Sequence, residues 1–415
     1  KSLSIRWVLI ASLANGISKA QNLLMSEDVI AALKSIKKLG VKVIYNNKIC
    51  KIYGVGIDGY KYKKNIIIDA QNSGTLGRLI MGILIDTPYK IKIIGDKSLS
   101  RRDFSRVITP LKKFGAEFEI KKNNLPLKMT GLTSPKSINY FEEKGSAQCK
   151  TTVMIAALKS KGITKIKAKK SRSHTEIMFK HLNIPIKIKR AKNFDFIQLK
   201  NIKKINNLNY KIPGDISSAS FFIVLTILAK NSKLIIKNIN INDTRIGIIH
   251  ILKKMGAQIK IINKKEYKGE KIGDIIVKSS SELKAINCPT KYNSNAIDEF
   301  LLIFLVAAKS KGISYFKKLS ELDKKESPRL IWASKILSYM GIKNIRNKHS
   351  IKIFGNPNLL IKRNIYIKGF LKDHRIFMMS VIAALTFGGN WKISDLDSIN
   401  TSFPTFLKIL KKIEH

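Results

Sequence analysis

Residues 73–84 read SGTLGRLIMGIL, a polar opening followed by an apolar run with helical spacing, and the chain repeats this phrase. Segments of the same kind begin at Ser2, Ser146, Ser217, Asp298 and Asp373. A second series of helix-like segments begins at Ser26, Arg102, Ser173, Thr244, Ser327 and Ser402. Both series recur about every 71 to 83 residues, and such a period indicates a fold made of repeated units. The sequence therefore predicts six repeats with two helices each.

Strands are expected between these helices. Several second helices end at a glycine, the residue favoured just beyond a helix C-terminus, at Gly40, Gly115, Gly256 and Gly341. Isoleucines then alternate with lysines, as between Ile184 and Ile188, which is typical of a half-buried strand. The resulting class is α/β (α+β), with three βαβ-like units on each side of Pro213-Gly214. We expect two similar domains, 1–212 and 213–415, with the active site in the cleft between them.

Composition limits the class of partner. The 415 residues carry a formal net charge of +50, but lysines are scattered and no compact basic block is present. Nucleic acid is therefore not expected as the main partner. The longest apolar runs, 300–308 and 221–228, are far shorter than a membrane span, so no membrane association is expected. Three cysteines without Cys-x-x-Cys spacing suit a reducing compartment and argue against disulfides or zinc.

The arginines are concentrated at helix starts. Seven of the 12 lie in the opening turns of repeat helices, namely Arg6, Arg78, Arg102, Arg172, Arg245, Arg329 and Arg375. A guanidinium binds carboxylate or phosphate in a bidentate manner that lysine cannot reproduce, and helix N-termini also favour anions. Together these positions predict a site that binds several anionic groups.

A few carboxylates, chiefly Asp298 and Glu326, stand among these cations and could move protons. The chain contains no His-Glu-x-x-His or Walker motif, so metal hydrolysis and nucleotide-dependent phosphoryl transfer have no motif to support them. From spacing alone the sequence predicts an enzyme that joins or splits small phosphorylated acids, with no cofactor and no metal.

Several motifs in register carry a resemblance to a known family. They include Lys1-Ser2-Leu3-Ser4-Ile5-Arg6, Asn72-Ser73-Gly74-Thr75, Ser146-Ala147-Gln148, Ser171-Arg172-Ser173-His174-Thr175-Glu176 and Lys325-Glu326-Ser327-Pro328-Arg329. In this order they resemble the EPSP synthases (3-phosphoshikimate 1-carboxyvinyltransferases) of the enolpyruvyl transferase family, over essentially the whole chain. The resemblance implies two domains, each of three βαβαββ repeats in an inside-out α/β barrel. It also implies that the usual N-terminal strand of the second domain is missing before residue 1.

The resemblance further implies an activity and its residues. The enolpyruvyl group of phosphoenolpyruvate would pass to the 5-hydroxyl of shikimate 3-phosphate, releasing phosphate, in aromatic amino-acid biosynthesis. Shikimate 3-phosphate would be bound by Lys1, Ser2, Arg6, Ser146, Ala147, Gln148, Arg172, Asp298 and Lys325. Phosphoenolpyruvate would be bound by Lys1, Gly74, Arg102, Gln148, Arg329 and Arg375. Asp298 would deprotonate the hydroxyl, and Glu326 with Lys1 would handle the proton at the methylene carbon.

Structural alternatives stay open for some of these residues. Asp298 could be a helix N-cap, and Glu326 could be an ion-pair partner of Arg329. Three positions depart from the family pattern. Pro328 replaces an aspartate that could orient Arg329, Asp103 replaces a proline after Arg102, and Ser173 replaces an aspartate.

Other functions are weighed against this one. The sister enzyme that acts on UDP-N-acetylglucosamine carries a reactive cysteine in a loop of its first domain, and residues 97–106 contain none. An RNA-terminal-phosphate or RNA-binding protein of related fold is a remoter alternative, and few aromatic clusters for base stacking are visible. A non-enzymatic basic binding module is a third. We expect a cytoplasmic enzyme that is a monomer.

Overall fold

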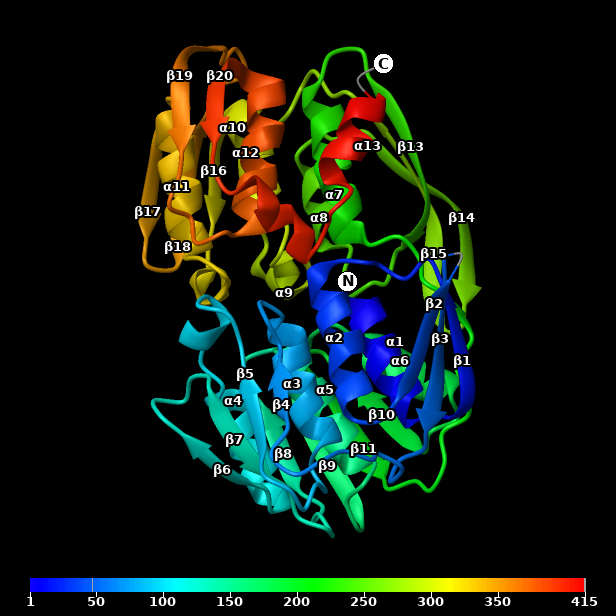
Figure 1. Ribbon diagram of the computed structural model, residues 1–415. Helices are drawn as coiled ribbons and strands as arrows, with labels where there is room; N and C mark the ends of the chain where they lie inside the picture. Colours follow the sequence, from blue (N-terminus) through cyan, green and yellow to red (C-terminus); the bar gives the residue numbers. More distant parts are fainter. Residues whose placement is uncertain (47, 414–415) are drawn as a thin grey trace. The chain divides into compact units, whose positions relative to one another are not determined.

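The structure is a computed structural model that describes residues 1–46 and 48–413. The chain forms two compact units, Lys1–Ile212 and Pro213–His415. Figure 1 labels the elements of both. Among the described residues, no helix has both the length and the apolar composition needed to cross a bilayer.

Unit 1 contains three repeats of two helices each. The helices are α1 (Ser2–Leu13), α2 (Glu27–Lys38), α3 (Gly74–Ile83), α4 (Ser105–Phe114), α5 (Ala147–Ala157) and α6 (His174–His181), with the short 3₁₀ helix η1 (Leu99–Arg101). The strands are β1 (Asn15–Gln21), β2 (Lys42–Asn46), β3 (Ile49–Val55), β4 (Ile67–Asp69), β5 (Ile91–Ile94), β6 (Glu117–Ile120), β7 (Leu127–Thr130), β8 (Asn139–Glu142), β9 (Ile163–Lys169), β10 (Ile186–Arg190), β11 (Phe194–Lys200) and β12 (Tyr210–Lys211).

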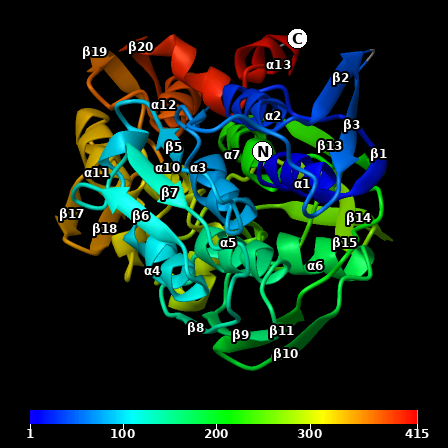
Figure 2. The ribbon, with the colours of Figure 1, turned by 60° about the horizontal axis from the view of Figure 1, so that its bottom comes forward.

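The three sheets of unit 1 share one topology. Their strand orders are β12-β1-β3-β2, β4-β5-β7-β6 and β8-β9-β11-β10, and in each the first pair is parallel and the next two are antiparallel. Figure 2 shows these sheets on different sides of helices α1, α3 and α5. The parallel partner of β1 comes from the end of the unit, where Trp7 also donates a hydrogen bond to the Leu208 carbonyl at 2.9 Å. The last segment of the unit therefore completes its first sheet.

Unit 2 repeats this plan with smaller sheets. Its helices are α7 (Ile216–Leu228), α8 (Gly247–Lys254), α9 (Asn293–Ala296), α10 (Phe300–Lys309), α11 (Arg329–Tyr339), α12 (His374–Phe387) and α13 (Phe406–Ile413), with 3₁₀ helices η2 (Thr290–Tyr292), η3 (Ser320–Lys324) and η4 (Leu396–Thr401). Its strands are β13 (Lys233–Asn240), β14 (Ile259–Tyr267), β15 (Glu270–Lys278), β16 (Gly312–Phe316), β17 (Asn344–Asn347), β18 (Ser350–Gly355), β19 (Ile361–Ile367) and β20 (Gly388–Ile393).

The sheets of unit 2 are antiparallel β13-β15-β14, antiparallel β16-β18-β17 and the parallel pair β19-β20. Single parallel bridges, such as Gly214 with Ile239 and Asn287 with Tyr315, stand where unit 1 has a full parallel strand. The predicted α/β repeat is therefore present in both units.

The first helix of each repeat forms the core. Helices α1, α5, α7 and α10 are buried along almost their whole length, and α7, α10 and α12 contact one another. Such helices are apolar on all sides, as expected for helices at the centre of a domain. Since the sheets lie outside them, the prediction of helices inside a layer of strands is confirmed.

The predicted helix starts are mostly correct. Ser73, Ser146 and Asp373 occupy the N-cap positions of α3, α5 and α12, and their side chains accept a backbone hydrogen bond there. At Ser217 the expectation of a cap is wrong, because Asp215 caps α7 and Ser217 lies inside the helix. The start at Arg102 is also wrong, because the turn η1 precedes it and α4 begins at Ser105.

A close approach between strand and helix recurs in both units. A methyl group added at Gly54, in β3, would lie 2.2 Å from the Ala14 carbonyl oxygen at the C-terminus of α1. At Gly355, in β18, it would lie 2.0 Å from the Ser310 carbonyl oxygen at the C-terminus of α10. Any side chain here would push the strand away from the helix, so the packing of the repeat requires glycine.

We therefore predict that Gly54→Ala and Gly355→Ala each lower the free energy of unfolding by about 1–3 kcal/mol or more, as overpacked sites do. Gly77→Ala in α3 is the control, because its added methyl would have its nearest neighbours at 3.4 and 3.5 Å. That change should be neutral or should stabilise by up to about 1 kcal/mol. Thermal unfolding followed by circular dichroism measures all three, and equal effects would contradict the packing argument.

Candidate active site

In unit 1 a buried arginine joins three helices. Arg6 in α1 is 4% exposed, and its Nε donates to Thr175 Oγ1 of α6 at 2.9 Å while Nη2 donates to Thr151 Oγ1 of α5 at 3.2 Å. The two threonine hydroxyls also hydrogen-bond each other at 2.7 Å. These neutral acceptors fix the guanidinium without cancelling its charge, which suits an anion-binding group.

The first residues of the chain lie beside the same helices. Lys1 pairs with the buried carboxylate of Asp28 in α2, with Nζ and Oδ2 3.0 Å apart. The backbone carbonyl of Ser2 accepts a hydrogen bond from Arg6 Nη1 at 3.2 Å. Arg172 is half-buried in the turn between β9 and α6. The structure therefore brings Ser2 and Arg6 together and anchors Lys1 to the neighbouring helix.

A second set of polar groups gathers at the start of α3. Arg78 donates to the Gln148 side-chain oxygen at 3.0 Å and to the Gly74 carbonyl at 3.1 Å. Gln148 in turn donates to Thr75 Oγ1 at 3.0 Å. A methyl group at Gly74 would lie 2.8 Å from Arg78 Nη1 and 2.9 Å from Arg102 Nη1. Gly74 therefore leaves the space into which two guanidinium groups project.

The pKa of Arg78 reflects this setting. Burial, helped by the positive charges of Arg102 and Arg106, lowers this pKa to about 10, while Cys149 and Asp103 oppose the shift. A guanidinium whose pKa is lowered by burial and by neighbouring cations would be stabilised by a bound phosphate or carboxylate.

The start of α5 is rigid. Ser146 Oγ caps the helix by accepting from Cys149 N at 3.3 Å, and Glu142 accepts from Ser146 N at 2.8 Å. Burial raises the pKa of the Glu142 carboxyl, although three backbone amides oppose the shift. Ala147 is the first residue of α5. Ser146, Ala147 and Gln148 thus lie on one well-held first turn.

The departure at Asp103 has a local explanation. Its carboxylate accepts hydrogen bonds from Ser105 N and Ser105 Oγ, both at 2.7 Å, at the first residue of α4. Its backbone carbonyl accepts from Arg78 Nη2 at 3.2 Å. The aspartate therefore stabilises a helix N-terminus, where a negative charge is favourable.

In unit 2 one arginine gathers three carboxylates. Arg329 begins α11 and is 1% exposed. Its Nε lies 2.9 Å from Asp373 Oδ2, Nη2 lies 3.2 Å from Asp373 Oδ1, Nη1 lies 3.3 Å from Asp298 Oδ1, and Nη2 also pairs with Glu326. Burial alone would lower the pKa of this guanidinium, but the three carboxylates, Asp373 foremost, raise it above its usual value. Arg329 therefore remains a cation that holds the carboxylates together.

This cluster settles two points left by the sequence. Pro328 occupies the N-cap position of α11, so the helix forms without the aspartate of the family pattern. The sequence suggested that Arg329 loses an orienting carboxylate there, but Asp373 supplies a two-point contact from α12. The contact between Glu326 and Arg329 is present as well, and it holds the Glu326 carboxylate beside the cluster.

Asp298 lies just before α10 rather than at its N-cap, which is Glu299. Its Oδ1 is 3.1 Å from Lys325 Nζ and 3.3 Å from Arg329 Nη1. Its backbone carbonyl accepts from Arg375 Nη1 at 2.7 Å. The alternative reading of Asp298 as a simple N-cap is therefore wrong, and its carboxylate is placed among cations.

Sequence reasoning missed several side chains that hold these groups. Thr151 and Thr175 bind Arg6, Asp28 binds Lys1, and Ser217 binds Glu299. Each sits in or directly before the first half of a helix, so the repeat marked their positions. The partners of Thr151, Thr175 and Ser217 lie one or more repeats away, and that of Asp28 lies at the start of the preceding helix; the period carries no signal for such pairings.

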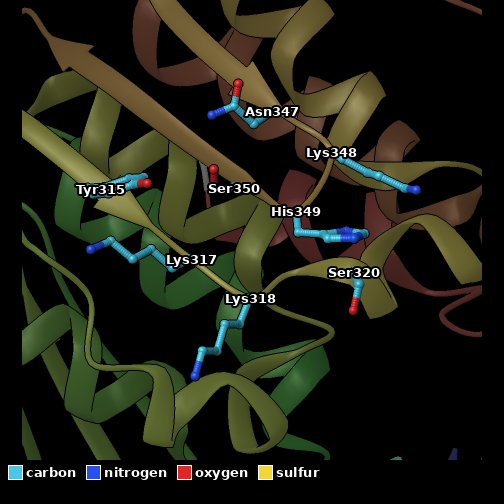
Figure 3. A pocket seen from close by; sticks show the side chains of 8 residues that line it. All are labelled: Tyr315, Lys317, Lys318, Ser320, Asn347, Lys348, His349 and Ser350. Atoms are coloured by element: carbon cyan, nitrogen blue, oxygen red, sulfur yellow. The ribbon is translucent and has the colours of Figure 1, made fainter.

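A surface pocket of unit 2 is a separate feature. It has a volume of about 500 Å³ and is lined by Tyr315, Lys317, Lys318, Ser320, Asn347, Lys348, His349 and Ser350. In Figure 3 the three lysine ammonium groups point away from one another. They do not converge on one anion, so this pocket is not a second candidate site.

Comparison with solved structures defines the class of protein. EPSP synthase from Acinetobacter baumannii matches with a TM-score of 0.85 and 32% identity, covering 99% of this chain and 93% of that one. The enolpyruvyl transferase NikO from Streptomyces tendae has the same fold at 11% identity, with a TM-score of 0.75 over 100% of this chain and 93% of the other. The fold is that of the enolpyruvyl transferases.

Sequence comparison defines the family. The model of the EPSP synthase (3-phosphoshikimate 1-carboxyvinyltransferase) family matches residues 1–410. A 3-phosphoshikimate 1-carboxyvinyltransferase from Ruthia magnifica subsp. Calyptogena magnifica is 39% identical, and one from Petrotoga mobilis is 37% identical. Both alignments cover 100% of this chain, with 93% and 95% of the two relatives. The chain belongs to the EPSP synthase family, and the predicted resemblance is confirmed.

We predict that Asp373→Asn destabilises the protein by about 3–5 kcal/mol, because it leaves the buried Arg329 with one charged partner fewer. The control is Asp397→Asn. Its exposed pair with Lys372 has both side chains about 60% exposed, and its loss should change stability by less than about 1 kcal/mol. Thermal unfolding compares the two, and similar shifts would contradict the role given to Asp373.

Proposed function

We propose that this chain transfers the enolpyruvyl group of phosphoenolpyruvate to the 5-hydroxyl of shikimate 3-phosphate and releases phosphate. The observation that carries the proposal is that the helix starts of the two units present different chemical groups. Unit 1 offers arginines bonded to neutral oxygens, and unit 2 offers carboxylates held beside Arg329 and Lys325. The reaction needs both a cage of cations for two anionic substrates and groups that move protons.

The binding roles are those that the family resemblance implies. Shikimate 3-phosphate is bound by Lys1, Ser2, Arg6, Ser146, Ala147, Gln148, Arg172, Asp298 and Lys325. Phosphoenolpyruvate is bound by Lys1, Gly74, Arg102, Gln148, Arg329 and Arg375. The contact between Arg6 and two threonines supports the first set, and the open space at Gly74 supports the second.

The proton transfers are assigned to unit 2. Asp298 takes the proton of the 5-hydroxyl, whose oxygen then bonds to C2 of phosphoenolpyruvate while Glu326, with Lys1, delivers a proton to C3. In the tetrahedral intermediate, Glu326 takes a proton back from C3, and the double bond reforms as the C2–O bond to phosphate breaks and phosphate leaves. The cations around Asp298 support its role as a carboxylate that is ionised before the reaction.

The setting of the enzyme is also proposed. The two compact units would be the two three-repeat domains of the family, acting in one monomer in the cytoplasm. Cys50, Cys149 and Cys288 are free and buried, which suits a reducing compartment. Sedimentation equilibrium across a range of protein concentrations tests the monomer, and a mass twice that of the chain would contradict it.

We predict that Asp298→Ala and Glu326→Ala each reduce kcat by about 10²-fold or more, the usual effect of losing a group that transfers protons. Phosphate release from phosphoenolpyruvate, dependent on shikimate 3-phosphate, is the assay. Glu266→Ala, at an exposed position of β14, should retain the wild-type rate. Near-normal turnover in either test variant would remove that residue from the mechanism. Turnover with UDP-N-acetylglucosamine instead would replace the proposed function by that of the sister enzyme.

A second prediction concerns Gly74. In Gly74→Ala the new methyl would crowd Arg78 and Arg102, whose flexible ends can shift but then move away from the anion. We expect KM for phosphoenolpyruvate to rise about tenfold or more, with a smaller change for shikimate 3-phosphate. Steady-state kinetics with each substrate varied in turn decides this, and equal changes in both KM values would argue against the assignment.

A further inference from the structure

A network of alternating charges in unit 2 links Asp215, Arg245, Ser217 and Glu299, to which no role is assigned above, with the proposed ligand Arg375. Arg245 Nη2 donates to Asp215 Oδ1 at 3.0 Å and to Ser217 Oγ at 2.6 Å. Ser217 Oγ donates in turn to Glu299 Oε1. Arg375 Nη1 lies 3.8 Å from the same Glu299 oxygen. The order is therefore carboxylate, arginine, hydroxyl, carboxylate, arginine.

The middle of this network is almost completely excluded from water, whereas the side chains of Asp215 and Arg375 at its ends are 23% and 12% exposed. Glu299 is 0% exposed, Arg245 is 3% exposed and Ser217 is 5% exposed. Glu299 Oε2 has no hydrogen-bond partner among the described residues. A carboxylate in such a place is costly unless nearby cations balance it, and Arg375 is the cation closest to its bonded oxygen.

The geometry connects this network of side chains to the proposed site through Arg375. Arg375 Nη1 donates to the backbone carbonyl of Asp298 at 2.7 Å and faces the side chain of Glu299, the next residue. Arg375 N also donates to Asp373 Oδ1 at 2.9 Å, which fixes the start of α12. One end of the guanidinium is thus held by two adjacent residues, and the rest of the fork can receive a ligand.

Resting on the proposed function, we propose that Glu299, held by Ser217 and Arg245, is a positioning residue that orients Arg375 toward the carboxylate or phosphate of phosphoenolpyruvate. Arg245 belongs to the helix-start arginines, but neither substrate is assigned to it. Its contacts give it a structural purpose: it keeps the Ser217 hydroxyl proton directed at Glu299, because the Oγ lone pair accepts from the guanidinium.

The test uses Glu299→Gln in the full chain, because the amide keeps the size of the side chain and an oxygen for Ser217 but removes the charge facing Arg375. We expect KM for phosphoenolpyruvate to rise about tenfold, KM for shikimate 3-phosphate to change less than about twofold and kcat to change less than about threefold. Ser217→Ala should raise the same KM by a smaller factor. Glu266→Gln, at an exposed position in β14, is the matched control and should behave as wild type.

A double-mutant cycle separates positioning from general destabilisation. If Glu299 acts through Arg375, then Glu299→Gln adds no further rise in KM for phosphoenolpyruvate once Arg375→Ala is present. Equal rises in both KM values, or additive effects with Arg375→Ala, would overturn the proposal. So would an unchanged KM in Glu299→Gln when thermal unfolding shows a folded protein. A wild-type chain that does not turn over the two substrates would instead contradict the proposed function, so the two failures are distinguishable.

Discussion

Buried charge at the first turns of helices is the constraint on which this structure depends. The central helices are largely apolar, and their buried charged side chains, such as Arg6 in α1 and Lys150 in α5, lie in the first two turns. Lys150 and Glu176, for example, are 0% and 2% exposed, and their Nζ and Oε1 atoms lie 2.5 Å apart near the starts of α5 and α6. Replacing such a pair by apolar residues is often neutral or stabilising, so stability alone does not account for charge in these positions. Under the proposed function, substrate binding would account for those buried charges that belong to the proposed site.

The repeat made much of the fold predictable, because periodicity depends on local chemistry. Polar openings, apolar faces and terminal glycines are properties of single segments, and the left-handed residue Gly115 that ends α4 was visible as a glycine in the sequence. The errors are also local. At Ser217 a stronger cap stood two residues earlier, at Asp215, and near Arg102 a turn of 3₁₀ helix delayed the start of α4. A competing cap or turn shifts a boundary without changing the repeat.

The contacts of the candidate site were less predictable, because they join residues that lie far apart in the sequence, in different repeats. Arg6 meets Thr175 across 169 positions, and Ser217 meets Glu299 across 82. A sixfold repeat offers several equivalent partners for each such group, and the choice depends on side-chain length and local twist. Family resemblance named most of the groups assigned to the substrates. It gave no role to Thr151, Thr175 or Glu299, which contact those groups.

The arginines at the helix starts of the two units differ in their hydrogen-bond partners, and the partner decides how much of the positive charge is compensated. Arg78 donates to amide and carbonyl oxygens, which leave its positive charge largely uncompensated and attractive to an anion. Arg329 donates to three carboxylates, so its charge holds Asp298, Glu326 and Asp373 around one cation. An ionised carboxylate beside a cation is a weak base at rest. It becomes more basic when an incoming anion engages the cation, because the favourable charge interaction is then shared. Substrate binding and activation of the base would thus be one event, arising from which oxygen each helix-start arginine meets.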